Sequence, residues 1–332
     1  SLSSMKDFFI IFRVIFINLT LTIFNQAVIM FLLILSGILC FKLKLISVKG
    51  SKEMSSLILQ VVNPVVIFVS YQREFDKKLL NGLLLSFVLS VVAYAIAIAV
   101  SYLAIRKKDG IEYDIERFSS IYSNCGFMGI PLINALLGLE GVFYLTAFIT
   151  IFNLLAWTHG VIQMSGVKSF KNIVSAFRSP SVIAIFVGLI SFLLRAFISP
   201  EMTQTIAESI PMKALGYIGD LNTPLAMIVA GCSIAQVNIL AAVKKPRIYF
   251  VSALRLIIIP SIIVVLFRLL NVSEEPMLTI IVAMSAPTAT MATLFCLKYD
   301  KNYVYSSEIF AVTTLFSIAT MPLIVAFSNL LK

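Results

Sequence analysis

The sequence predicts an all-α polytopic membrane protein with ten transmembrane helices. Hydrophobic residues occupy 60% of its 332 positions and charged residues 13%, whereas soluble proteins average about 45–50% apolar and about 25% charged residues. The mean hydropathy is +1.01. Apolar runs long enough to cross a bilayer lie at 24–43, 54–71, 80–105, 117–138, 141–164, 179–199, 212–235, 246–270, 276–297 and 304–330.

The fourth and ninth of these segments carry helix-breaking residues. Residues 119–138 read SSIYSNCGFMGIPLINALLG, and residues 280–297 read IIVAMSAPTATMATLFCL. Pro131 and Pro287 each remove a backbone donor and so free carbonyls that hydrocarbon cannot satisfy. Irregular backbone at this depth is stable only where it is buried in protein or lines a cavity. Such interruptions in both halves of a chain are typical of the midplane site of a secondary transporter.

The two halves of the chain also share a pattern. VNPVVIFVSY at 62–71 and NTPLAMIVAG at 222–231 have the same polar, proline, apolar order, and LTAFITIFNLLAW at 145–157 resembles IFAVTTLFSIATM at 309–321. Because five spans per repeat is an odd number, the repeats should be inverted relative to each other. We expect an N-terminal lead-in or interfacial helix at 1–23, a first five-helix repeat at 24–164, a short cytoplasmic linker at 165–178 and a second repeat at 179–332.

Lysine and arginine residues gather in alternate loops between the predicted spans. They are dense at 42–52, 106–117, 168–178, 244–247 and 298–301, whereas the opposite loops hold fewer basic and more acidic residues. Loops rich in these cations stay on the cytoplasmic side, so both termini are expected outside the cell membrane. The net charge of +10 is explained by this topology, and nucleic acid is not an expected partner.

Several phrases of the chain resemble the auxin efflux carrier family, which includes the plant pin-formed carriers and bacterial malate or malonate carriers. They are NPVVIF at 63–68, SNCGFMGIPLINALLG at 123–138, LAMIVAGCSIA at 225–235, RLIIIP at 255–260 and SAPTATMATLFCLKYDKN at 285–302. The short linker resembles the compact bacterial members. The resemblance implies that helices 4 and 9 are broken and cross at the centre. It also implies a scaffold from helices 1, 2, 6 and 7, a moving domain from helices 3–5 and 8–10, and a homodimer.

The broken segments are the candidate substrate site. A broken helix brings N–H groups and carbonyls together, so a carboxylate can be held there without a permanent cation. The candidate substrate-binding residues are Asn124, Gly126, Gly129, Pro131, Ser285, Pro287, Thr288 and Thr290. The alternative is a pair of kinked helices whose glycines only allow close packing. In the scaffold, helix breaks are expected at Asn63, Pro64, Thr223 and Pro224.

Three ionisable residues lie inside predicted spans, and each has more than one interpretation. Arg255 is suited to attract an anionic substrate or to bind broken-helix carbonyls, and the alternative is that it snorkels to the surface. Asp220 is interpreted as a coupling-proton site, a partner for a cation, or a cap for the following half-helix, with capping favoured. The single histidine, His159, is interpreted as interfacial in preference to a proton relay.

A polar stripe runs along the last span. Thr313 and Thr314 lie four and three residues before Ser317, and Thr320 lies three after it, so this group follows one face of a helix. We expect this face to line the site across from Asn153. Hydroxyl groups in membrane helices often bond to their own backbone instead.

Other functional classes lack their sequence signatures. No Walker A, H-E-x-x-H or G-x-S-x-G motif occurs, so neither ATP use nor hydrolysis is expected and the chain is not predicted to be an enzyme. The four cysteines lie in apolar segments without ligand spacing, and no metal or cofactor is expected. We expect a carrier that moves a small organic anion by elevator-like alternating access. The alternatives are a sodium- or proton-coupled symporter of the bile-acid-transporter type and a channel or receptor.

Overall fold

The computed structural model describes residues 24–108, 112–166 and 177–331. Helices make up most of this part of the chain, which contains one isolated β-bridge and no strand. The predicted all-α polytopic membrane fold is confirmed. The expected lead-in helix at 1–23 and most of the linker at 165–178 lie outside the described residues.

Eight helices in the described ranges are long and apolar enough to span a membrane. They are Phe24–Lys42, Val48–Ser70, Lys77–Ala104, Cys125–Ser165, Pro180–Phe197, Ile210–Ala235, Pro246–Leu269 and Tyr303–Leu330. The ninth predicted span is divided into α16 (Glu274–Ser285) and α17 (Met291–Lys298), which are short individually. The fourth and fifth predicted spans run together in Cys125–Ser165, which Gly138 interrupts with φ 62° and ψ −158°. The count of ten therefore stays a prediction.

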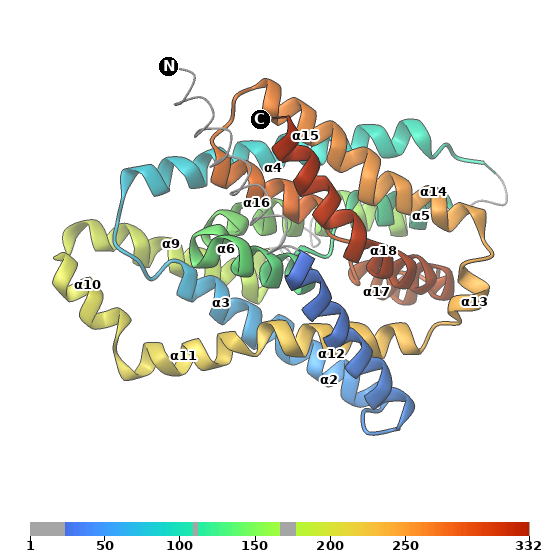
Figure 1. Ribbon diagram of the computed structural model, residues 1–332, viewed down its shortest axis with the longest axis horizontal. Coiled ribbons are helices and arrows are strands. Elements are labelled where there is room, and N and C mark those ends of the chain that lie inside the picture. The colour runs from blue at the N-terminus through green and yellow to red at the C-terminus, as the bar shows by residue number, and fades with distance from the viewer. Residues whose placement is uncertain (1–23, 109–111, 167–176, 332) are drawn as a thin grey trace, which may run out of the picture.

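One side of the molecule is built from the helices of the predicted first, second, sixth and seventh spans. Besides the helix Phe24–Lys42, these are α2 (Val48–Leu57), η1 (Ile58–Val62), α3 (Asn63–Ser70), α9 (Pro180–Leu194), α11 (Ile210–Asp220) and α12 (Asn222–Ala235). Helix α3 packs against α9 and α11, and α12 packs against α2. Figure 1 shows α2, α3, α11 and α12 along one edge of the molecule.

The remaining helices form a second group that includes α16. They are α4 (Lys77–Ala104), α5 (Tyr113–Ile121), α6 (Ile130–Leu155), α14 (Pro246–Ala253), α15 (Ile259–Leu269) and α18 (Tyr303–Leu330). Helix α16 contacts α4, α6 and α18, and Figure 1 shows α4, α15 and α16 opposite the edge that α11 and α12 form. The spans Cys125–Ser165 and Pro180–Phe197 end in α7 (Val161–Ser165) and η4 (Arg195–Phe197), and the short connecting helices are α10 (Pro200–Ala207) and α13 (Ile239–Ala242).

The helix Phe24–Lys42 crosses α12 at backbone contact distance. A Cβ on Gly37 would lie 2.2 Å from the carbonyl oxygen of Ile228, and a Cβ on Gly231 would lie 2.1 Å from that of Ile34. No side chain fits at either position. Paired glycines of this kind let membrane helices approach closely and gain van der Waals contact.

The described residues contain four π-helical turns, of which η3 (Ala156–Gly160) has no proline near its end. The other three each end two residues before a proline. They are η1 before Pro64, η2 (Cys125–Gly129) before Pro131 and η5 (Leu254–Ile258) before Pro260. Proline offers no N–H to the carbonyl four residues back, and its ring crowds that carbonyl. The preceding turn widens as a result, so that its last bond runs to the fifth residue back, for example from Asn63 N–H to the Ile58 carbonyl.

The two expected scaffold breaks are corrected by these observations. Asn63 has helical φ and ψ values of −60° and −48°, so Asn63 and Pro64 lie in a continuous helix that contains a π-turn. In the seventh predicted span, α11 ends at Asp220 and α12 begins at Asn222. The helical pattern changes only at Leu221, whose φ and ψ of −66° and −17° are still right-handed helical, ahead of Thr223 and Pro224.

Candidate functional site

The two broken segments meet and pair with each other. The chain leaves helical geometry after Ile121 at the end of α5 and after Ser285 at the end of α16. The unwound segments then run antiparallel, with Ser123 opposite Thr288 in an isolated β-bridge. The N–H of Asn124 donates to the Pro287 carbonyl at 2.7 Å, and that of Ala289 donates to the Tyr122 carbonyl at 2.9 Å. These bonds satisfy backbone groups that hydrocarbon could not. We call this pairing of residues 122–124 with 287–289 the crossover.

Arg255 joins the helix ends on either side of the crossover. Its guanidinium donates to the carbonyls of Ser120 and Ile121 at 3.0 and 2.8 Å, and to those of Ala286, at 3.2 Å, and Met284. These carbonyls end α5 and α16, where the helix dipole places negative partial charge. Of the alternatives considered for Arg255, the structure shows binding to broken-helix carbonyls.

The charge of Arg255 is deeply buried. Its exposed fraction is 0%, and none of the ion pairs found among the described residues includes it. It lies in η5, the π-turn that precedes Pro260. Carbonyl dipoles therefore solvate a fixed positive charge beside the crossover, and no carboxylate of the described residues forms an ion pair with it.

Donor groups without partners gather where the fourth segment becomes helical again. Asn124 is buried, and its Nδ2 has no hydrogen-bond partner. The next N–H groups belong to the first turn of a helix and have no carbonyl ahead of them within that helix. Gly126 in this turn is only partly buried, and a Cβ there would lie 3.3 Å from Nδ2 of Asn63. The positive end of a half-helix and two side-chain amides thus meet at Gly126.

The second broken segment ends differently. Two N–H groups in the first turn of α17 are already used, because those of Ala292 and Thr293 donate to the carbonyls of Ala289 and Thr290 at 3.1 and 3.2 Å. Thr290 itself is partly buried. Anion-binding geometry is therefore concentrated at the first segment.

The two predicted breaks are not equivalent in position. Pro287 lies within the crossover, but Pro131 lies in the first turn of α6, beyond the π-turn that Gly129 closes. The sequence placed the first break at Pro131, whereas the chain unwinds at 122–124. Pro131 accounts for the π-turn and not for the break.

Two of the hydroxyl groups that the sequence predicts at the substrate site bond to backbone carbonyls instead. Ser285 Oγ donates to the Ile281 carbonyl at 2.6 Å, and Thr288 Oγ1 donates to the Ser119 carbonyl at 2.8 Å. Both groups therefore stabilise the crossover from within. Their bonding leaves Asn124 as the predicted site side chain with a free buried donor.

The stripe on α18 reaches the crossover at one point. Thr313 Oγ1 accepts from the Thr288 N–H at 3.3 Å, whereas Ser317 Oγ donates to the Thr314 carbonyl at 2.7 Å. Asn153 Nδ2 donates to the Ile149 carbonyl of its own helix at 2.8 Å. Thr314 and Thr320 have buried hydroxyls without partners.

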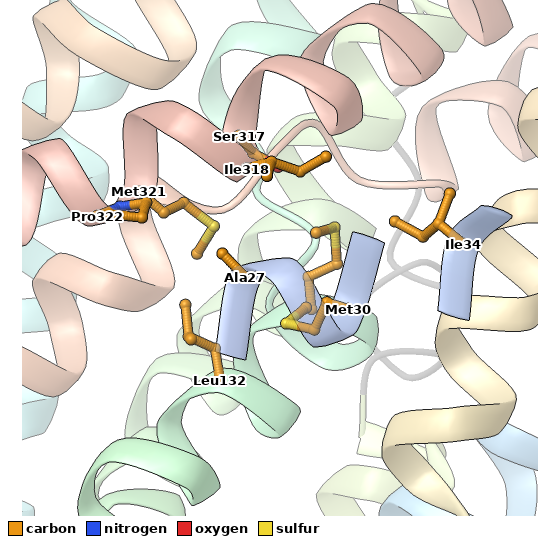
Figure 2. A pocket seen from close by; sticks show the side chains of 9 residues that line it. Ala27, Met30, Ile34, Leu132, Ser317, Ile318, Met321 and Pro322 are labelled. Carbon is orange, nitrogen blue, oxygen red and sulfur yellow. The ribbon is translucent and has the colours of Figure 1, made fainter. Parts of the chain in front are cut away.

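A small apolar cavity separates the helix Phe24–Lys42 from the broken segment and α18. Its volume is about 10 Å³, close to the smallest space that holds one water. Figure 2 shows side chains from these three elements converging on it. The lining residues are Ala27, Met30, Ile34, Met128, Leu132, Ser317, Ile318, Met321 and Pro322. The two sides of the molecule are nearly in contact here.

Asp220 and His159 occupy different settings. Asp220 is exposed, and α12 has no side-chain cap, so the capping role expected for Asp220 is wrong.

Both ring nitrogens of His159 contact tyrosine hydroxyls. Nδ1 lies 2.9 Å from the hydroxyl of Tyr122, and Nε2 lies 3.1 Å from that of Tyr102. Tyr122 is part of the crossover, so the histidine is linked to the site by one side chain.

An ionic cluster at one end of the molecule was missed by sequence reasoning. The buried Glu116 carboxylate accepts from Arg247, whose Nε lies 3.0 Å away, and from Tyr305 Oη at 2.9 Å. Nearby, Asp114 accepts from Lys301 Nζ at 2.7 Å, and this hydrogen bond raises the pKa of Lys301. These contacts join α5 to α14 and to the start of α18. Their partners are far apart in sequence, so no local pattern indicates them.

Comparison with known proteins identifies the family. The profile of a family described as membrane transport protein matches residues 22–175 and 169–325. The chain belongs to this family, the auxin efflux carriers. The resemblance that the sequence suggested is thereby confirmed. No curated protein matches the chain. As a member of the auxin efflux carrier family, the chain is a multi-pass membrane transporter, and the family is not one of enzymes.

Proposed function

We propose that this auxin efflux carrier family member is a secondary transporter of a small organic anion such as a carboxylate. The observation that supports this most strongly is the fixed charge of Arg255, buried beside the crossover with carbonyl partners alone. A buried charge without a counter-ion is costly, and a bound anion offsets that cost. The free amide of Asn124 and the first turn at Gly126 supply the donors.

The proposed movement is an elevator-like shift in the cell membrane. The helix Phe24–Lys42, α2–α3, α9 and α11–α12 would form a scaffold that stays fixed and dimerises, and the broken segments would move past it with the other helices. The support is the small cavity where the two groups of helices face each other.

Transport by purified protein in liposomes tests the function. A panel of monocarboxylates and dicarboxylates should show saturable uptake and counterflow, whereas cationic amines and neutral sugars should not. The same assay with sodium replaced by choline, or with the proton gradient collapsed, identifies any coupling ion. Uptake of cations or sugars alone would contradict the proposal. A large ion conductance without counterflow would indicate a channel.

Removing the Asn124 amide should weaken anion binding. We expect Asn124→Ala to raise the apparent dissociation constant of a transported carboxylate by about 5- to 150-fold, on the order of 1–3 kcal/mol for a lost buried partner. The matched control is Asn134→Ala, because Asn134 is exposed on α6. Equal affinities in both variants, measured by uptake kinetics, would remove Asn124 from the site.

A further inference from the structure

Two asparagines of the proposed scaffold form a buried pair. Nδ2 of Asn222, the first residue of α12, donates to Oδ1 of Asn63 at 2.6 Å. The exposed fractions of these side chains are 4% and 2%. The sequence pattern singled out Asn63 as a helix break and passed over Asn222. The signal that could have found Asn222 is the polar, proline order that NTP at 222–224 shares with NP at 63–64.

The pair faces the first turn of the broken segment. Helix α12 packs against η2, and Nδ2 of Asn63 lies 3.3 Å from the position of a Cβ on Gly126. The amides of Asn63 and Asn222 therefore lie across from the half-helix that begins after Asn124. Each group of helices contributes asparagine side chains to the same region.

Two amide atoms in this region lack partners. Oδ1 of Asn222 is a buried acceptor and Nδ2 of Asn124 a buried donor, and neither makes a hydrogen bond in the structure. Unsatisfied buried polar atoms are rare because each is costly. The bond to Asn63 uses Nδ2 of Asn222, which leaves its Oδ1 as the end available to a ligand.

A carboxylate cannot satisfy both atoms. Its oxygens only accept hydrogen bonds, so they suit Nδ2 of Asn124 but not Oδ1 of Asn222. A ligand that meets both needs an acid group and, separately, a hydroxyl or N–H donor.

We propose that Asn222, oriented by Asn63, determines specificity for carboxylates that also carry a hydrogen-bond donor. This inference rests on the proposed function. The acid group binds at the Asn124 end, and the hydroxyl or N–H of the same molecule donates to Oδ1 of Asn222. Sites built to bind a substrate hydroxyl reject analogues that lack it, because the site's own polar group is then left unpaired.

Matched substrate pairs test this assignment. Initial uptake of lactate is compared with that of propionate, and malate with succinate, because each pair differs by one hydroxyl. Wild-type protein should prefer the hydroxy acid of at least one pair by about tenfold or more. Asn222→Ala should bring that ratio close to one by slowing the hydroxy acid, and Asn222→Ser, which keeps a short acceptor, should retain part of it. Asn81→Ala, at an exposed position of α4, should leave the ratio unchanged.

Ligand-induced thermal shifts of the wild-type protein provide a second measurement that needs no folded variant. The hydroxy acid of the preferred pair should stabilise the protein more than its partner acid does. Carboxylate uptake and thermal shifts without any preference within a pair would overturn the inference and leave the proposed function standing. A preference that persists in Asn222→Ala would overturn it as well. Failure to transport any carboxylate would overturn the proposed function and this inference with it.

Discussion

Arg255 makes hydrogen bonds that neither broken helix can make for itself. Four carbonyls, two from the end of α5 and two from the end of α16, accept from its guanidinium. A planar group with five donors can serve several acceptors at once, which an ammonium cannot do in the same geometry. One side chain therefore connects both halves of the chain at the site.

Replacing this arginine should destabilise the protein and stop transport. Arg255→Leu leaves several buried carbonyls unpaired, and we expect a loss of at least about 2 kcal/mol, given roughly 1–3 kcal/mol for each unsatisfied group. Arg255→Lys keeps the charge but reaches fewer carbonyls, so it should be intermediate. Thermal unfolding in detergent measures the first effect and liposome uptake the second. Arg178→Leu, at an exposed position, is the control. Wild-type stability in Arg255→Leu would contradict the assigned bonding.

Among the elements, the two broken segments depend on proline in different ways. Ala286, just before Pro287, has extended backbone with ψ 152°, as proline imposes on the residue before it. Helix α16 therefore ends at Ser285. Pro131 instead follows a π-turn in a continuing helix.

The two prolines should consequently differ in importance. Pro287→Ala lets α16 extend through residue 286 and disrupts the bond between Asn124 and the residue 287 carbonyl, so transport should fall strongly at normal membrane insertion. Pro131→Ala restores one helical bond and should have a smaller effect. Uptake at matched expression compares them. A larger loss in Pro131→Ala would contradict the placement of the break at 122–124.

The crossing of the helix Phe24–Lys42 with α12 should tolerate no Cβ. Gly231→Ala places a methyl group 2.1 Å from a backbone oxygen, so the helices must separate, and we expect a loss of about 1–3 kcal/mol from overpacking. Gly216→Ala, in α11 with open space around it, should be neutral or slightly stabilising because alanine favours helix. Thermal unfolding of both variants provides the comparison. Equal stability would show that the crossing relaxes freely.

At the scale of the whole molecule, local pattern predicts some features and long-range contact decides others. Apolar runs predicted the spans because each segment that crosses lipid must itself be apolar and must satisfy its own backbone hydrogen bonds. Glycine and proline mark irregular backbone, which is why the sequence singled out Asn124 and Pro287, and both lie in the crossover. The sequence predicted the first break at Pro131 and not at 122–124. The break at 122–124 is stabilised by Arg255, which is more than a hundred residues away in the chain, so no local pattern indicates it. Asn222 and Glu116 were missed because their importance lies in their distant partners.

The structure offers two adjacent positions that distinguish movement between the helix groups from movement within the scaffold. Tyr71 Oη lies 2.6 Å from Thr146 Oγ1 of α6, which belongs to the proposed moving group. Its neighbour Gln72 accepts from Ser191 of α9 through Oε1 at 3.0 Å. Crosslinks at these two places restrain the same end of α3 against different partners.

The most direct test of the proposed shift is carboxylate uptake after crosslinking these cysteine pairs, in a background with the four native cysteines replaced. The linker is a short cleavable thiol reagent. Crosslinking Tyr71→Cys to Thr146→Cys should stop uptake, and cleaving the linker should restore it. Crosslinking Gln72→Cys to Ser191→Cys should leave uptake largely intact. Full uptake with positions 71 and 146 locked together, or equal loss from both crosslinks, would contradict a crossover that moves past a fixed scaffold.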